Sequence, residues 1–183
     1  MPRDTDRSHL HPVFRDKLAA LETALAAAGL PLLLFEAGRA PQRQQELFAQ
    51  GRVPGCGTFG HHVTNAKPWQ SFHQYGLAAD YVFFVDGKWT WDEPTPGAWA
   101  RYTQIASQVG LRSLSFERPH VEMPVSLSVL QAGHYPDGGD QTWIDWLDSM
   151  IEGWPHGAQT IDGITYPGAP PMPTAILRPP LVA

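Results

Sequence analysis

The sequence of 183 residues has few cysteines, few basic residues and no long apolar run, and each shortage excludes a class of protein. A single cysteine, Cys56, excludes an internal disulfide framework and any four-cysteine zinc site. Lys and Arg number 13 against 18 Asp and Glu, and because no basic run is present we expect no nucleic-acid partner. No apolar run reaches the roughly 18 residues of a membrane-spanning helix, so we expect no membrane insertion.

What is present is the composition of a globular chain, with 43% hydrophobic and 17% charged residues. The character of the chain changes at Pro155. Beyond that point proline is frequent, and only Asp162 and Arg178 carry a formal charge. We therefore predict one folded domain over residues 1–154 and a proline-rich irregular tail over residues 155–183.

Hydrophobic periodicity, with glycine and proline as punctuation, predicts a mixture of helices and short strands. Helices are expected over residues 12–28, 41–50, 95–110, 126–132 and 140–154. Strands are expected over residues 31–36, 77–85 and 88–91, with one or two short strands, broken at Pro119, over residues 114–123. This order predicts an α+β fold, a small antiparallel sheet with flanking helices, in preference to a doubly wound parallel sheet.

Residues 51–70 show no periodicity and are predicted to form a long loop. The run GCGTFG within it matches the dinucleotide-binding pattern G-x-G-x-x-G, but a helix precedes it where that motif requires a strand. Cys56 lies near His61 and His62, yet adjacent histidines on an extended segment point in opposite directions. The loop is therefore expected to hold a free thiol and neither a cofactor site nor a catalytic cysteine.

The segment SFHQYGLAAD, residues 71–80, combines a histidine with a carboxylate inside an apolar strand. His73 precedes the strand, and Asp80 lies within it. A buried carboxylate costs several kcal/mol of desolvation unless it is paired or bound to a cation. Asp80 is thus either a metal ligand or the partner of an arginine or a loop, and this segment alone leaves both open.

The segment ERPHVE, residues 117–122, supplies the ligand that a metal site would still lack. His120 completes a set of three with His73 and Asp80 and leaves a fourth tetrahedral position for water. Glu117 could then act as the general base for that water. Glu122 lies on the same strand face as His120 and is either its partner or an exposed acid, whereas His120 alone is also typical of a satisfied core histidine.

These motifs resemble a known family. SFHQYGLAAD is similar to the S-x-H-x-x-G-x-A-x-D signature of zinc peptidases that act on bacterial peptidoglycan, and ERPH is similar to their acid-x-x-His element. The family comprises D-alanyl-D-alanine carboxypeptidases and dipeptidases, together with the L-alanyl-D-glutamate endopeptidases of phage lysins. The runs VTNAKP and EAGRAPQRQQELFAQGR resemble the L-alanyl-D-glutamate branch most.

The resemblance implies a Zn²⁺ ion held by His73, Asp80 and His120. It implies that Glu117 is the general base that activates the water and then passes a proton to the leaving amine. Arg39 would stabilise the carbonyl oxygen as negative charge develops on it. The substrate would be the stem peptide of cell-wall peptidoglycan, cleaved at the L-alanyl-D-glutamate bond.

The resemblance further implies that Ser71 contacts the substrate and that the fold is the one shared with the hedgehog signalling domain. Two alternatives stay open: a D-alanyl-D-alanine carboxypeptidase or dipeptidase, and a non-catalytic, zinc-stabilised wall-binding or phage structural module. The presence of both Glu117 and Arg39 argues against the module, because a structural zinc site needs neither and favours a fourth protein ligand.

The first twelve residues carry charges but no apolar segment, so we expect no secretory signal. Together with the resemblance to phage lysins, this predicts a protein that accumulates in the cytoplasm and acts on the wall after release.

Overall fold

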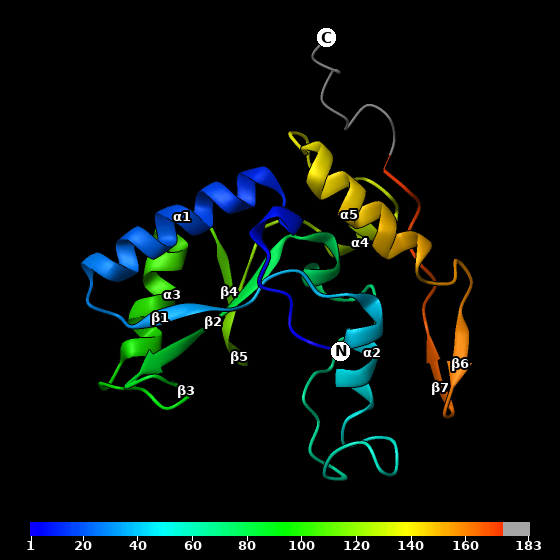
Figure 1. Ribbon diagram of the computed structural model, residues 1–183, viewed down its shortest axis with the longest axis horizontal. Helices are drawn as coiled ribbons and strands as arrows, with labels where there is room; N and C mark the ends of the chain where they lie inside the picture. The colour runs from blue at the N-terminus through cyan, green and yellow to red at the C-terminus, as the bar shows by residue number, and fades with distance from the viewer. Residues whose placement is uncertain (174–183) are drawn as a thin grey trace.

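The computed structural model describes residues 1–173, which form an α+β fold built around one small antiparallel sheet (Figure 1). The strands of this sheet are β1 (Leu32–Glu36), β2 (Ala78–Val85), β3 (Lys88–Thr90), β4 (Arg112–Leu114) and β5 (Glu117–Glu122). Their order is β1-β2-β5-β4, with β3 paired to β2 as a hairpin. The predicted fold class is confirmed.

The helices that flank the sheet follow the predicted order. They are α1 (Pro12–Ala27), α2 (Pro41–Ala49), α3 (Ala98–Gln108), α4 (Leu127–Gln131) and α5 (Gln141–Glu152), with two 3-10 turns, η1 (Arg7–His9) and η2 (Phe72–Tyr75). Helix α3 begins at Ala98, later than predicted, because Gly97 adopts a left-handed conformation with φ of 82° that a helix cannot contain. None of the described helices has the length and apolarity needed to cross a bilayer.

Helix α1 illustrates how the apolar pattern builds the core. Proline stands at its first position, where a missing N–H costs nothing, and Gly29 ends the helix with φ of 66°. The buried face consists of the residues that share the helical spacing: Phe14, Leu18, Leu21 and Leu25. That face contributes to the core, and α1 contacts α3.

The register of the sheet brings three polar residues into one row across its strands. β2 is the central strand, and its Asp80 pairs with His120 on β5 and with Glu36 on β1. Side chains of directly paired residues point to the same face, with Cβ atoms roughly 5 Å apart. The backbone pairing therefore places an acid and a histidine on either side of Asp80.

Strand β5 runs through Pro119, so the predicted break at this residue is wrong. Proline has no N–H to donate to a neighbouring strand. The β4–β5 pairing is irregular at this point, because its register shifts between Ser113 and Leu114, whose partners are Val121 and Glu117. Pro119 lies opposite this irregularity, and its carbonyl accepts a hydrogen bond from Tyr102.

The segment after residue 154 is not wholly irregular, which corrects the predicted tail. It contains a β-hairpin of β6 (Gln159–Ile161) and β7 (Ile164–Tyr166). Its turn is Asp162–Gly163, with φ of 52° and 75°, the combination that two-residue hairpin turns favour. Asp86–Gly87, which joins β2 to β3, has nearly the same pair of φ values, 51° and 75°.

This hairpin packs back on the rest of the chain, next to α2 (Figure 1). The ring of Tyr166 is buried against Phe48 of α2, and Lys67 donates to the carbonyl of Thr165. The boundary between residues 154 and 155 stays a prediction, and the rest of the predicted tail, residues 174–183, lies outside the described residues.

Helix α5 supports the turn that leads into β2. Asp140 caps the helix by accepting from the backbone N of Trp143 at 2.9 Å. Trp143 is fully buried, and its Nε1 donates to the carbonyl of Tyr75 in η2. Gly76 follows with φ of 64°, and a Cβ there would lie 2.5 Å from the carbonyl oxygen of His9. Trp143 of α5 therefore holds the η2 turn in place.

Candidate metal centre

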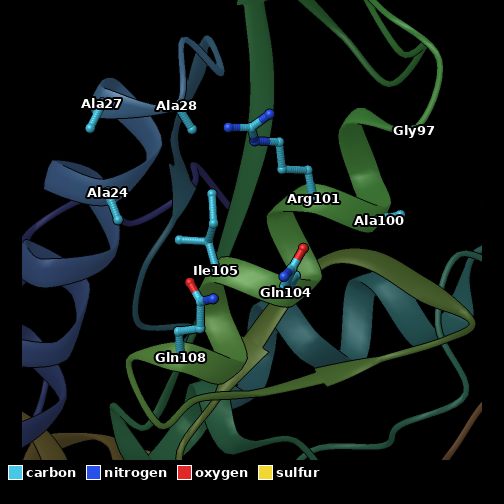
Figure 2. Close-up of a pocket in the computed structure, with 9 residues that line it drawn as sticks. All are labelled: Ala24, Ala27, Ala28, Gly97, Ala100, Arg101, Gln104, Ile105 and Gln108. Carbon is cyan, nitrogen blue, oxygen red and sulfur yellow. The ribbon is translucent and has the colours of Figure 1, made fainter.

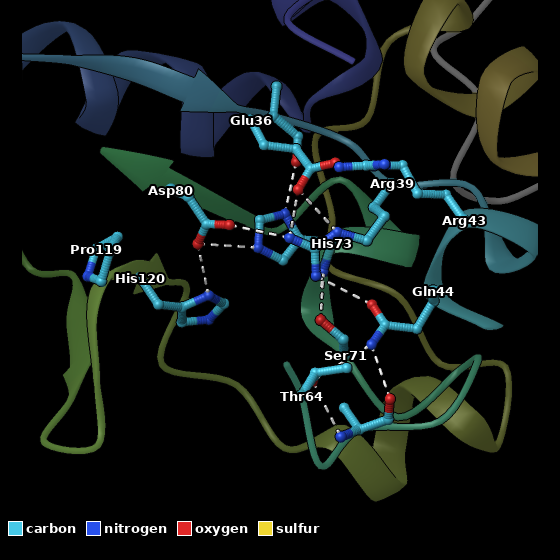
Figure 3. Close-up of polar contacts among 12 residues, drawn as sticks. Glu36, Arg39, Arg43, Gln44, Thr64, Ser71, His73, Asp80, Pro119 and His120 are labelled. Carbon is cyan, nitrogen blue, oxygen red and sulfur yellow. Dashed lines mark hydrogen bonds and ion pairs between the residues drawn. The ribbon is translucent and has the colours of Figure 1, made fainter. Parts of the chain in front are cut away.

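Three potential metal ligands from two distant segments meet on one face of the sheet. Asp80 lies on β2, His120 on β5 and His73 on η2. His73 Nε2 is 3.3 Å and His120 Nδ1 is 3.2 Å from the same Asp80 oxygen, and one ligand atom of each residue lies within 4.8 Å of the others (Figure 3). Ligand atoms 2.0–2.1 Å from a tetrahedral ion lie about 3.3 Å from one another, so the spacing fits zinc.

The remaining nitrogen of each imidazole is held by a hydrogen-bond acceptor. His73 Nδ1 lies 2.6 Å from the carbonyl oxygen of Ala37, and His120 Nε2 lies 2.9 Å from Glu122 Oε2. Each of these nitrogens therefore carries an N–H, so that His73 Nε2 and His120 Nδ1, on the side of Asp80, are the nitrogens available to bind a metal ion. Glu122 is buried and is the partner of His120, which settles the question left open by the sequence.

Buried opposite charges control the protonation of the cluster. Burial by itself would raise the pKa of Asp80, but His73, His120 and Arg39 hold it well below its usual value of 3.8. Burial would lower the pKa of His120, whereas Asp80 and Glu122 raise it to about 9. Without a metal ion, a proton on His120 thus takes the place of the cation.

Arg39 lies beside the cluster and donates hydrogen bonds to two carboxylates. Its Nη2 is 2.9 Å from Asp80 Oδ2 and 2.6 Å from Glu36 Oε2, and its Nε also donates to Glu36 (Figure 3). Its Nη1 donates to Gln44 at 3.0 Å. Burial lowers the pKa of Arg39, but Asp80 and Glu36 raise it above its usual value. Arg39 therefore stays charged and fixed in orientation.

Gln44 of α2 connects this arginine to the long loop. Its side-chain oxygen accepts from Arg39 and from Gln74, and its nitrogen donates to the carbonyl of Ala66 at 2.7 Å. The residue is fully buried. One amide thus fixes the arginine, the turn that carries His73 and the segment around Ala66.

Ser71 is the N-cap of η2. Its hydroxyl accepts from the backbone N of His73, while its own N–H donates to the side chain of Gln74 at 3.2 Å. This capping box orients the turn and hence the imidazole of His73. Ser71 also borders a hollow beside His120, so its predicted contact with substrate stays a prediction.

Glu117 is half-buried at the start of β5, where two hollows meet. One of about 640 Å³ is bordered by Asp80, and the other of about 520 Å³ by His120. Arg39 and Glu117 border both. The two residues predicted to be catalytic therefore lie together, next to the metal cluster and accessible from two sides.

A further hollow lies between α1 and α3 (Figure 2). Its lining is mostly of small residues, including Ala24, Ala28 and Ala100. No residue of the candidate metal centre borders it. The hollow between α1 and α3 is therefore separate from the two hollows that Arg39 and Glu117 border.

Two buried residues of the site were missed in the sequence. Glu36 ends an apolar strand three residues before Arg39, and this lone acid in PLLLFE was a signal that could have been weighed. Gln44 gave a weaker signal. The expected helix over residues 41–50 has few apolar positions, which indicates only that most of it is solvated or faces a cleft. The roles of the named site residues stay predictions.

The comparisons agree with the geometry. The chain is 32% identical over 128 residues to the peptidoglycan L-alanyl-D-glutamate endopeptidase CwlK of Bacillus subtilis, an alignment that covers 63% of this chain and 74% of that protein. The chain belongs to this family of peptidoglycan peptidases. The predicted resemblance is confirmed, although a scan of family models found no match.

Solved structures of two peptidases are more distant. They are the L,D-carboxypeptidase DacB from Streptococcus pneumoniae and the LD-carboxypeptidase LdcB, each with a TM-score of 0.47 and 23% identity. Both matches cover 67% of this chain, and they cover 70% and 68% of the two solved chains.

Proposed function

We propose that this protein is a zinc-dependent peptidoglycan hydrolase that cleaves the stem peptide at the L-alanyl-D-glutamate bond. The observation that carries the proposal is the convergence of His73, Asp80 and His120 at ligand spacing beside Glu117 and Arg39. The family of the chain supports the substrate class, since the related B. subtilis protein is named for that bond.

The donor set suits zinc. Two imidazole nitrogens and one carboxylate oxygen are typical of catalytic zinc sites, which keep a further position for water or substrate. When bound, the ion would act as a Lewis acid on the water and on the peptide carbonyl. Glu122 and the carbonyl of Ala37 hold the two imidazoles in the orientation that such an ion requires.

Glu117 and Arg39 supply the remaining chemistry. Glu117, from its place between the two hollows, accepts a proton from the attacking water and returns it to the leaving amine. A guanidinium has five N–H donors, and four of those of Arg39 are directed to Glu36, Asp80 and Gln44. The fifth, on Nη1, is left to donate to the carbonyl oxygen of the substrate as it becomes negative.

Mass spectrometry of digested peptidoglycan tests the proposal. The zinc-loaded protein should release fragments with a new D-glutamate N-terminus, and chelation of zinc should stop the release until zinc is restored. Release of free D-alanine instead would identify a carboxypeptidase. Binding to the wall with no new amine would identify a non-catalytic module and contradict the proposal.

A further inference from the structure

The two hollows that meet at Arg39 and Glu117 differ in chemistry. The larger, which we call the aromatic pocket, has an aromatic lining of Phe35, Trp91, Trp99 and Phe116. The smaller, which we call the amide pocket, is lined with side-chain amides from Asn65, Gln70 and Gln131. Phe116 borders both hollows, so the contrast lies in the two tryptophan rings, Trp91 and Trp99, which border only the larger one, and in the three amides, which border only the smaller one.

The aromatic pocket exposes two rings, of which Trp91 packs against its neighbours. Trp91 is 53% exposed and Phe116 is 78% exposed. The indole of Trp91 packs edge-on against Phe35 at 5.2 Å between ring centroids. Phe35 also packs against Trp89 at 5.2 Å and lies under the guanidinium of Arg3, 3.7 Å from its ring centroid. The carbonyl of Trp91 accepts from Trp99 Nε1 at 3.1 Å. An exposed ring that packs against a neighbour and borders a pocket, as Trp91 does, is typical of ligand recognition.

We propose that the aromatic pocket binds the sugar ring to which the stem peptide is attached. This inference rests on the proposed function, because in peptidoglycan the L-alanyl residue follows the sugar directly. The C–H groups on the face of a pyranose ring pack well against an aromatic ring, and both are removed from water when they do so. The volume of about 640 Å³ lies within the roughly 300–1,000 Å³ of small-molecule sites.

Continuity with the reacting groups sets the direction of the substrate. Asp80, Arg39 and Glu117 border the aromatic pocket, so a sugar placed against Trp91 leaves its first peptide bond near them. The rest of the stem peptide, with its D-glutamate carboxylate and backbone amides, then enters the amide pocket, where Asn65 and Gln131 offer hydrogen bonds. The direction rests on the tryptophan rings alone, because Arg43 and Arg118 also border the aromatic pocket and Phe72 also borders the amide pocket.

Binding of a remote sugar contributes to the rate when it fixes the peptide for attack. The wild-type protein should therefore hydrolyse an N-acetylmuramyl tripeptide that contains the L-alanyl-D-glutamate bond with a higher kcat/KM than the free tripeptide. An aromatic residue central to recognition makes a roughly ten- to hundredfold difference when it is truncated. The expected preference for the muramyl substrate is of that size.

The test compares the two substrates in matched variants. In Trp91→Ala the ratio of the two kcat/KM values should fall toward one, and in Trp91→Phe it should stay above that of the alanine variant. Phe59→Ala is the control, since Phe59 is 75% exposed and borders neither pocket, and its ratio should equal that of the wild type.

The ratio separates the possible outcomes. A wild-type protein that cleaves both substrates equally, or a Trp91→Ala variant that keeps the full preference, overturns the sugar site and leaves the proposed function standing. A Trp91→Ala variant that slows both substrates by the same factor also overturns it, because the residue would then act through the fold. Failure of the zinc-loaded wild type to cleave either substrate overturns the proposed function and this inference together.

Discussion

At the scale of single residues, the candidate site depends on how buried charges are shared. Asp80 faces two imidazoles through one oxygen and Arg39 through the other, so each of its oxygens is engaged. Four buried or half-buried carboxylates, on Glu36, Asp80, Glu117 and Glu122, surround this arginine and the two histidines. Arg43 and Arg112 pair with Glu36 and Glu122, so three guanidinium groups face the four carboxylates, and a metal cation would offset the negative charge that remains while both imidazoles are neutral.

The first prediction concerns the general base. Glu117→Gln keeps the shape of the side chain but removes its ability to accept a proton, so kcat should fall by roughly 10²–10⁴-fold. Zinc content should stay at one ion per chain, because Glu117 is not among the ligands. Kinetics on muropeptides together with metal analysis check this. Full activity in the zinc-loaded variant would show that another group acts as the base.

The second prediction concerns Glu36, which orients Arg39. Glu36→Gln removes one of the two carboxylates that hold the guanidinium, and loss of a partner in a buried ion pair costs up to about 3–5 kcal/mol of stability. We expect a lower kcat with a smaller change in KM, because the role we propose for Arg39 is to act on the carbonyl as charge develops. Glu152→Gln, at the exposed end of α5, is the control. An unchanged kcat would show that Arg39 is positioned without Glu36.

At the scale of elements, the strands and helices were largely predictable, but their pairing was not. Alternation in residues 77–85 predicts that Asp80 and Val82 share a face. It does not predict that Glu36 is the residue opposite Asp80, because the β1–β2 register shifts between Leu34 and Glu36. The meeting of His73, Asp80 and His120 was expected from the two motifs and the family resemblance, whereas Glu36 and Gln44 enter the site only through strand pairing and helix packing.

The third prediction is the pH dependence of metal binding. Because Asp80 and Glu122 raise the pKa of His120 to about 9, a proton competes with the metal below that pH. The dissociation constant for zinc should therefore rise about tenfold per pH unit as the pH falls below 9. Glu122→Gln removes one cause of the raised pKa, so the onset should move to lower pH. Chelator competition between pH 6 and 9 measures the zinc dissociation constant of the wild type and of the variant.

The stability of the zinc-free protein depends on pH in the opposite direction to its zinc affinity. The pKa of His120 is raised on folding, so its contribution is complete below the unfolded value of 6.5 and is lost as the pH rises through about 9. Denaturant unfolding of the zinc-free protein should show this decline.

The zinc titration has its own contradicting outcome. A zinc affinity that does not change between pH 9 and 6.5 would contradict ligation by His120.

At the scale of the whole molecule, the part of the chain beyond the sheet supports the site from behind. Helix α5 holds η2 through Trp143, and the β6–β7 hairpin covers Phe48 of α2. The cap at Asp140 and the helical spacing made α5 predictable. The hairpin was missed because the high proline content of residues 155–183 outweighed its Asp162–Gly163 turn signal.

The fourth prediction separates the two supports. Trp143→Ala should lower the free energy of unfolding by about 3–5 kcal/mol, as is typical of a buried aromatic residue. It should also weaken zinc binding, because the turn carrying His73 loses its contact. Trp154→Ala is the matched control, since Trp154 is also buried and also donates to a backbone carbonyl, that of Pro167. Calorimetry and zinc titration should show destabilisation in both variants and weaker binding only in the first.

The pairing of Asp80 with His120 also has a consequence for the order of events during folding. These two residues are 40 positions apart and become neighbours only when β5 has joined β2, so the complete ligand set does not exist in a chain whose strands are unpaired. Tight binding of zinc should therefore follow assembly of the sheet. In stopped-flow refolding with a fluorescent zinc indicator, the capture rate should stay constant as the zinc concentration rises, because the chain itself sets the pace.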